Sequence, residues 1–171
     1  VELLQRAIAA GIPQERLPNI HFLLGNEYYL LGDLEKAIAA QERALELNPA
    51  FSPSWLSLGT AYRAIGEPDR AEECYRRAVE LAPERPEGYL SLGWLYLEQG
   101  DVEQALDLLD QALGVDPGSG TAYAYQAMAY ALQGRFEQAQ ASLELARKNG
   151  YADWQLLQGQ IEAWEAVWQE P

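Results

Sequence analysis

Residues 55–83 read WLSLGTAYRAIGEPDRAEECYRRAVELAP, and this stretch decides the fold because its pattern recurs every 34 residues along the chain. The side chains that recur are Trp55, Leu58, Gly59, Tyr62, Ala71, Tyr75, Ala78 and Pro83. Self-similarity at a fixed period of roughly 20–50 residues indicates a repeat protein, in which each repeat buries its apolar face against its neighbours. The period therefore predicts a solenoid.

The residue types persist when the sequence is read in steps of 34. The first aromatic column is His21, Trp55, Tyr89 and Tyr123, and the second is Tyr28, Tyr62, Tyr96 and Tyr130. The small-residue columns are Gly25, Gly59, Gly93 and Ala127; Ala37, Ala71, Ala105 and Ala139; and Ala44, Ala78, Ala112 and Ala146. We take the repeats as residues 18–51, 52–85, 86–119 and 120–153. A small residue at a helix crossing lets two helices approach closely, so bulk at Gly59 or Gly93 should destabilise the protein.

Glycine, aspartate and proline predict where the helices begin and end. Each first helix should end at a glycine in the left-handed conformation, at Gly32, Gly66, Gly100 or Gly134. The second helices should begin with Asp33 and Asp101 as N-caps and with Pro68 in a first turn, whereas Arg135 supplies no cap. They should end before Pro49, Pro83 and Pro117, and in the fourth repeat at Asn149–Gly150.

Partial elements flank the four repeats. Residues 1–10 place Leu3, Leu4, Ala7, Ile8 and Ala10 at helical spacing, which predicts the second helix of a degenerate preceding repeat that acts as a cap. A connector then leads to Pro18 in the first turn of the next helix. After Asp153, a possible N-cap, an amphipathic helix over 154–170 should close the other end. Residues 1–171 thus read as a single domain, and because the chain begins at Val1 inside a helix we expect a piece of a longer protein.

Residues 55–83 match the spacing W-x2-L-G-x2-Y…A-x3-F…P, with Tyr75 in the place of Phe, and the chain therefore resembles the tetratricopeptide repeat family. The resemblance implies an all-α fold, a right-handed α-solenoid (superhelix) of antiparallel helix pairs. It also implies a concave groove, lined by the first helices, that grips a peptide or helix of another protein. The candidate groove residues are Phe22, Asn26, Tyr29, Leu56, Thr60, Arg63, Leu90, Trp94, Leu97, Tyr125 and Met128.

Composition excludes several ligand classes. Twelve basic and 26 acidic side chains give a formal charge of −14, which argues against nucleic acid or an anionic membrane and allows a basic protein partner. No apolar run is long enough for a membrane helix, and the N-terminus lacks the features of a signal peptide. No compartment is indicated, so cytoplasm is the default. Cys74 is the only cysteine, which rules out an intrachain disulfide and a Cys-based metal site.

The sequence contains no set of residues that is typical of an active site. His21 is the only histidine and belongs to an aromatic packing column, and the phosphate-binding, dinucleotide and HExxH motifs are all missing. We predict no enzyme activity and no catalytic, cofactor-binding or metal-binding residues. Family members that hold a C-terminal carboxylate use a clamp of Lys, Arg and Asn, of which only Asn26 is present here. An apolar or amphipathic segment is therefore the expected ligand.

The leading interpretation is a non-enzymatic scaffold or adaptor for protein–protein interaction. Binding affinity should be concentrated around Leu56, Leu90, Trp94, Leu97 and Tyr125, with Trp94 at the centre. Glu87 and Glu98 beside this patch should favour a partner segment flanked by Lys or Arg. Two alternatives remain open: a homo-oligomerisation module that acts through the solenoid ends, especially the tryptophan-bearing last helix, and a regulatory domain of a larger protein.

Overall fold

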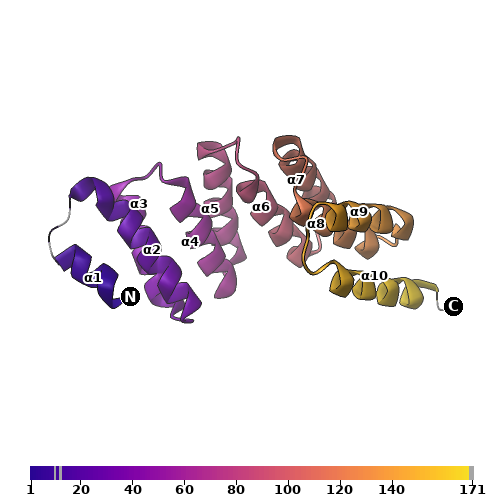
Figure 1. The fold of residues 1–171 in the computed structure, drawn as a ribbon, viewed down its shortest axis with the longest axis horizontal. Helices are drawn as coiled ribbons and strands as arrows, with labels where there is room; N and C mark the ends of the chain where they lie inside the picture. The colour runs from indigo at the N-terminus through magenta and orange to yellow at the C-terminus, as the bar shows by residue number, and fades with distance from the viewer. Residues whose placement is uncertain (10, 12, 170–171) are drawn as a thin grey trace. The chain divides into compact units, whose positions relative to one another are not determined.

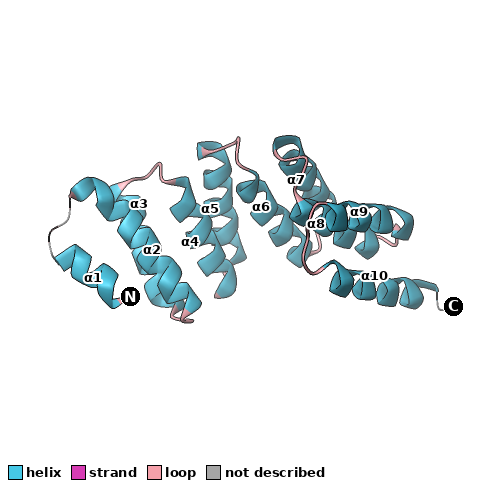
Figure 2. Cartoon of the chain, in the orientation of Figure 1, coloured by secondary structure: helices cyan, strands magenta, loops and turns pink. Residues whose placement is uncertain are grey.

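The computed structural model describes residues 1–9, 11 and 13–169, and there the chain folds into helices joined by short turns (Figures 1 and 2). The helices are α1 (Glu2–Ala9), the short 3-10 helix η1 (Gln14–Arg16), α2 (Leu17–Leu30), α3 (Leu34–Leu47), α4 (Ser52–Ala64), α5 (Pro68–Leu81), α6 (Pro86–Gln99), α7 (Val102–Val115), α8 (Gly120–Leu132), α9 (Phe136–Lys148) and α10 (Trp154–Gln169). Because the described residues contain no strand, the predicted all-α class is confirmed.

The chain divides into two compact units, which we describe separately. The N-terminal unit, Val1–Pro83, contains the helix pairs α2–α3 and α4–α5, with α1 packed on α2. The C-terminal unit, Glu84–Pro171, contains the pairs α6–α7 and α8–α9, and α10 packs on both α8 and α9 (Figure 1). The single domain and the capping role of the first 17 residues stay predictions, and Ala10, expected in the first helix, lies outside the described residues.

The period of the sequence is also the period of the structure. The second helices begin at residues 34, 68, 102 and 136, and they end at 47, 81, 115 and 148, as the prolines and the Asn149–Gly150 pair predicted. The helix after Asp153 begins at Trp154 and reaches Gln169. The solenoid of paired helices is therefore confirmed within each unit.

The turn between the two helices of a repeat is built in the same way four times. Gly32, Gly66, Gly100 and Gly134 all have a positive φ, between 71° and 81°, as predicted. The amide of the residue after each glycine donates to the carbonyl of the tyrosine five residues before it, at 2.9 Å in every repeat. This is the hydrogen bond of a Schellman helix end, so one glycine and one backbone bond position each second helix.

The helix starts also follow the predictions. The Asp33 and Asp101 side chains each accept a hydrogen bond from the backbone amide three residues on, at 3.3 Å. Pro68 occupies the first turn of α5, and Arg135 provides no side-chain cap.

Each glycine at a helix crossing leaves room for the side chain found 16 residues later. A Cβ added at Gly59 would lie 2.6 Å from Cε1 of Tyr75, and one added at Gly93 would lie 3.1 Å from Cδ2 of Leu109. At Gly25 the added atom would meet the Gln41 side chain at 2.5 Å. In the fourth repeat, alanine and leucine take these two places, at positions 127 and 143, and both are buried. At the helix crossing of each repeat, a small residue thus packs against one larger side chain.

The first repeat contains the one polar member of this partner set. Gln41 is 1% exposed, and its Nε2 donates to Oδ1 of Asn26 at 3.0 Å and to the Phe22 carbonyl at 3.1 Å. Its Oε1 has no hydrogen-bond partner among the described residues. Burying an unpaired amide oxygen costs free energy, so the first repeat carries a local penalty that the leucine-containing repeats lack.

Candidate functional site

The structure uses several of the predicted groove residues of the N-terminal unit for packing. Phe22 contacts Phe51 edge to face, with ring centroids 5.5 Å apart, and Asn26 accepts the hydrogen bond from Gln41. The Thr60 hydroxyl donates to the Leu56 carbonyl at 3.0 Å and accepts from Tyr75 at 3.3 Å. The remaining candidates of this unit are partly exposed: Tyr29, Leu56 and Arg63. Phe22, Asn26 and Thr60 are partly exposed as well, so the groove on α2 and α4 stays a prediction.

In the C-terminal unit the structure brings three candidates together. Trp94 of α6 lies beside Tyr125 and Met128 of α8, and all three line a pocket of about 280 Å³. Leu90 is partly exposed. Leu97 is a correction: it is only 8% exposed, so almost none of its side chain is open to a partner. The spacing alone places Leu97 near Trp94 on α6 but does not distinguish a buried side chain from an open one.

The rest of this pocket comes from the turn before α10 and from α10 itself. These lining residues are Tyr151, Asp153, Leu156, Leu157 and Gln160. Leu156 is 66% exposed, so the pocket opens to solvent beside a bare apolar side chain. We call this site, with Trp94, Tyr125 and Met128, the Trp94 pocket. A 34-residue step from the start of α8 gives residue 154, so α10 takes the place of a fifth first helix. That register is the signal that could have found these lining residues, which the sequence analysis missed.

The indole of Trp94 is held from two sides. Its ring centroid lies 4.8 Å from that of Tyr125, with the planes tilted by 42°. Its Nε1 donates to Oε1 of Glu98 at 2.8 Å, one helical turn further along α6. A buried tryptophan normally satisfies its N–H in this way, and here the bond orients an aromatic face that is still partly exposed.

Carboxylates of Asp153 and Glu98 lie at the Trp94 pocket, within an acidic unit. Residues 84–171 carry 14 acidic and four basic side chains, so most of the net negative charge of the chain lies in the C-terminal unit. Asp153 is part of the lining, where burial and this neighbouring carboxylate raise the pKa of Tyr151. Glu87 is instead paired with Arg85 at 2.8 Å, and that hydrogen bond lowers the pKa of Glu87. Glu98 and Asp153, and not Glu87, are therefore the carboxylates at this site.

A second pocket, of about 390 Å³, lies among α3, α4 and α5 of the N-terminal unit. We call it the Trp55 pocket; its lining residues are Glu42, Leu45, Glu46, Trp55, Leu58, Tyr62, Arg70, Glu73 and Cys74. The sequence offered no signal for it, because its residues belong to packing columns or to exposed helix surfaces.

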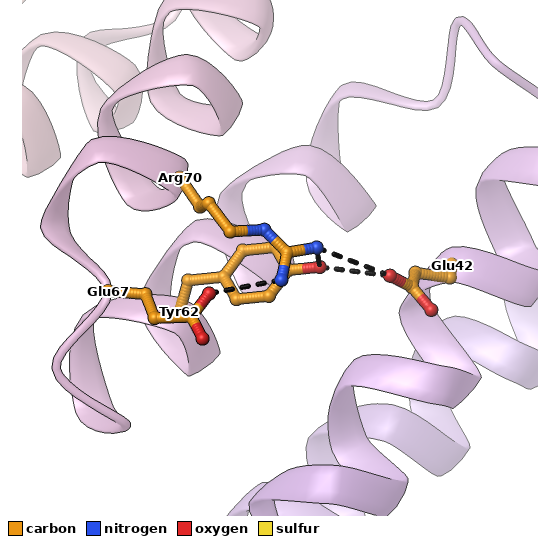
Figure 3. A network of polar contacts seen from close by, with 4 residues as sticks. All are labelled: Glu42, Tyr62, Glu67 and Arg70. Atoms are coloured by element: carbon orange, nitrogen blue, oxygen red, sulfur yellow. Dashed lines mark hydrogen bonds and ion pairs between the residues drawn. The ribbon is translucent and has the colours of Figure 1, made fainter.

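A polar network forms one wall of the Trp55 pocket (Figure 3). The Tyr62 hydroxyl donates to Oε1 of Glu42 at 2.9 Å, and burial together with this hydrogen bond raises the pKa of Tyr62. Arg70 lies flat over the Tyr62 ring, with Cζ 3.8 Å from the centroid, and donates to Glu67 at 3.0 Å. Arg70 also donates to the Tyr62 hydroxyl. The phenol and the guanidinium are thus already occupied by neighbours within the protein.

The environments of the lone histidine and the lone cysteine both disfavour the charged form of the side chain. Burial and nearby Arg43 lower the pKa of His21, which stays neutral at physiological pH. Burial raises the pKa of the Cys74 thiol to about 12, so the nucleophilic thiolate is scarce. Among the described residues, no group of three or more His, Cys, Asp and Glu side chains is arranged to hold a metal ion. Within the same residues, no helix has the length and hydropathy needed to cross a bilayer.

The sequence from residue 4 to residue 167 matches the family model described as the cilia and flagella-associated protein 70 C-terminal domain, a model of tetratricopeptide repeats. The chain belongs to this tetratricopeptide repeat family. A search of curated proteins finds no matching relative of this repeat domain. Domains built from tetratricopeptide repeats are generally non-enzymatic scaffolds that bind other proteins.

Solved structures resemble this tetratricopeptide repeat domain over most of its length. The crystal structure of MamA has a TM-score of 0.73 at 22% identity, covering 85% of this chain and 84% of MamA. A thermophilic tetratricopeptide repeat protein of Thermus thermophilus gives 0.72 at 27% identity, covering 88% and 80% of the two chains. A chain of the APC/C hetero-tetramer Cut9–Hcn1 gives 0.78 at 17% identity, with 86% of this chain matched to 28% of that one. The likenesses to MamA and to the APC/C chain show the fold alone.

Proposed function

We propose that this domain is a non-enzymatic scaffold whose Trp94 pocket binds an apolar or amphipathic segment of another protein. The observation that carries the proposal is an open pocket in which Trp94, Tyr125 and Met128 adjoin a leucine, Leu156, that is 66% exposed. Clustered aromatic and apolar side chains at a surface favour protein binding, and tryptophan and tyrosine are enriched among residues that dominate binding energy. The general role of tetratricopeptide repeats agrees with this assignment.

The Trp94 pocket is pre-organised for a ligand. Trp94 is fixed by its hydrogen bond to Glu98 and by its contact with Tyr125, so little side-chain freedom remains to be lost on binding. Met128 is unbranched and adapts its shape to an incoming group. A rigid aromatic wall next to an adaptable side chain suits an inserted apolar side chain of a partner.

The size of the pocket favours a polypeptide over a small metabolite. Its volume of about 280 Å³ lies just below the range of roughly 300–1,000 Å³ that is typical of small-molecule sites. It has room for one or two large side chains, with the rest of the partner segment on the neighbouring surface. An amphipathic helix that inserts a Leu, Met or aromatic residue meets this requirement.

The charge around the pocket selects among such segments. Glu98 and Asp153 flank the apolar lining in a unit with an excess of acidic side chains. A partner with Lys or Arg beside its apolar residues gains from this field, chiefly in its association rate and its salt dependence. We therefore expect a basic amphipathic segment as the ligand.

Selection from a random peptide display library on the intact chain tests the proposal. The selected peptides should be apolar with flanking basic residues, and their affinity should be measured by calorimetry with the unmodified chain and with Trp94→Ala. Hot-spot truncations cost more than about 1 kcal/mol, so the Kd should rise by at least about fivefold. Glu98→Lys should also raise the Kd, and by a larger factor at low salt than at high salt.

Leu145→Ala is the matched control, since it removes an exposed apolar side chain of α9 that does not line the pocket. It should leave the Kd unchanged. Circular dichroism should show that Trp94→Ala keeps its helices. Equal affinities for Trp94→Ala and Leu145→Ala, in folded proteins, would refute binding at the Trp94 pocket.

A second candidate function is self-association through α10, favoured by the exposure of Val167 at 68% and Trp168 at 61% near its C-terminal end. Large exposed apolar side chains are typical of oligomer contacts. Light scattering across a range of concentrations separates the two functions. A dimer that Val167→Lys converts to monomer, with peptide affinity at the Trp94 pocket unchanged, would establish self-association as an additional activity.

A further inference from the structure

We propose that the Trp55 pocket of the N-terminal unit is a separate binding site, and that it takes the side chain of a lysine or arginine from a partner polypeptide. The pocket combines an apolar interior with a mouth of carboxylates among α3, α4 and α5. Lysine and arginine side chains match this arrangement, because each has an aliphatic stem that ends in a cation.

The interior is apolar and its main wall is fixed. Leu45, Trp55 and Leu58 form most of it, and the Cys74 thiol, 4% exposed, adds a small neutral surface. The Trp55 indole Nε1 donates to the Pro49 carbonyl at 2.9 Å, which holds the ring in place. The same ring borders an adjoining hollow of about 410 Å³, so the indole projects between two open spaces. A tryptophan face of this kind attracts a cation as well as an alkyl chain.

The mouth carries an excess of negative charge. Three carboxylates, of Glu42, Glu46 and Glu73, line the pocket together with one cation, Arg70, and Glu46 is also paired with Arg43 at 2.6 Å. Arg70 is shared among several groups, because it pairs with Glu67 at 3.0 Å, lies over the Tyr62 ring and makes only a longer ion pair with Glu42, at 3.9 Å (Figure 3). An arriving ammonium or guanidinium therefore meets carboxylates from two helices, α3 and α5.

The same features exclude other ligand classes. Anions such as phosphates would be repelled by the three carboxylates, and a neutral apolar side chain would gain nothing from them. The volume of about 390 Å³ exceeds that of one lysine side chain, so the backbone next to the inserted residue is also accommodated. A residue within a polypeptide fits this space better than a free amine does.

NMR of the intact chain tests the site directly. The indole N–H signal of Trp55 is identified by its loss in Trp55→Phe, and the probes are the N-acetyl methylamides of lysine, arginine and norleucine, together with n-pentylammonium. The lysine and arginine probes should shift the Trp55 signal saturably. Norleucine, which keeps the stem without the charge, should bind at least about threefold more weakly, and raising NaCl from about 20 to about 200 mM should weaken the cationic probes alone.

Charge-neutralising variants of exposed carboxylates complete the test without disturbing the interior. Glu73→Gln and Glu46→Gln should each raise the Kd of the lysine probe by about threefold or more, while Glu35→Gln, an exposed glutamate of α3 outside the pocket, should not. Equal binding of norleucine and lysine, or equal effects of Glu73→Gln and Glu35→Gln, overturns the cation site. Tighter binding of n-pentylammonium than of both amino-acid probes overturns the assignment to a polypeptide.

Discussion

Replacing Gly59 with alanine tests the close helix crossing on which each repeat is built. The added Cβ would lie 2.6 Å from Cε1 and 2.7 Å from Cδ1 of Tyr75, well inside normal contact. Tyr75 is 2% exposed and bonded to Thr60, so its ring has no free space to move into. Overpacking of this kind costs about 1–3 kcal/mol, whereas alanine gains about 1 kcal/mol over glycine in helix propensity. We expect a net loss of up to about 2 kcal/mol in the free energy of unfolding.

Gly114→Ala is the control, because nothing lies within 4 Å of its added Cβ on α7. Gly114→Ala gains helix propensity without a steric clash, so the free energy of unfolding should stay the same or rise. The double variant Gly59→Ala/Tyr75→Leu copies the alanine–leucine pair of the fourth repeat, so it should be less destabilised than the sum of its single changes. Urea unfolding followed by circular dichroism measures the unmodified protein, Gly59→Ala, Tyr75→Leu, the double variant and Gly114→Ala. Identical unfolding midpoints for Gly59→Ala and Gly114→Ala would refute the close crossing.

Three further predictions concern buried groups. Gln41→Leu should raise the free energy of unfolding by about 1 kcal/mol, because it removes a buried unpaired amide oxygen. Urea unfolding measures the change. A lower free energy of unfolding would mean that the lost hydrogen bond to Asn26 outweighs the removal of the unpaired oxygen. Cys74 should resist iodoacetamide at about pH 8 in the folded protein and react after denaturation, as measured by mass spectrometry; rapid labelling of the native protein contradicts this. His21 has its pKa lowered from 6.5 in the folded state, so the unfolded chain binds its proton more readily and stability should fall as pH drops through and below 6.5. The His21→Gln variant should lose this part of the pH dependence of the melting temperature, and an unchanged slope would contradict it.

The helix ends could be predicted because the residues that set them act locally. Gly66 ends a helix through its own backbone conformation, Asp101 caps one through a bond to an amide three residues away, and Pro83 restricts its predecessor. None of these effects depends on distant parts of the chain. The period then placed Trp94 and Tyr125 on neighbouring first helices, which the structure brings into ring contact.

The rest of the site depends on packing that no local pattern contains. Leu156 reaches the Trp94 pocket only because Leu157 and Ile161 are buried when α10 packs on α8 and α9. Leu97 and Trp94 are three residues apart on one helix, and only their different neighbours bury the first and leave the second partly exposed. The Trp55 pocket likewise arises from three helices together.

The side chain that packs against the small residue at a helix crossing differs between repeats, and this difference favours correct pairing of the helices during folding. A solenoid of identical repeats gains as much from pairing a first helix with the second helix of the wrong repeat as with its own. Here Gly59 packs against the ring of Tyr75, and pairing α4 with α3 in the same register would put the Gln41 amide in its place and lose the hydrogen bond from Tyr75 to Thr60. A chain whose first two repeats differ at this position penalises a 34-residue slip between them, so the departure from perfect repetition helps to keep each helix with its own partner.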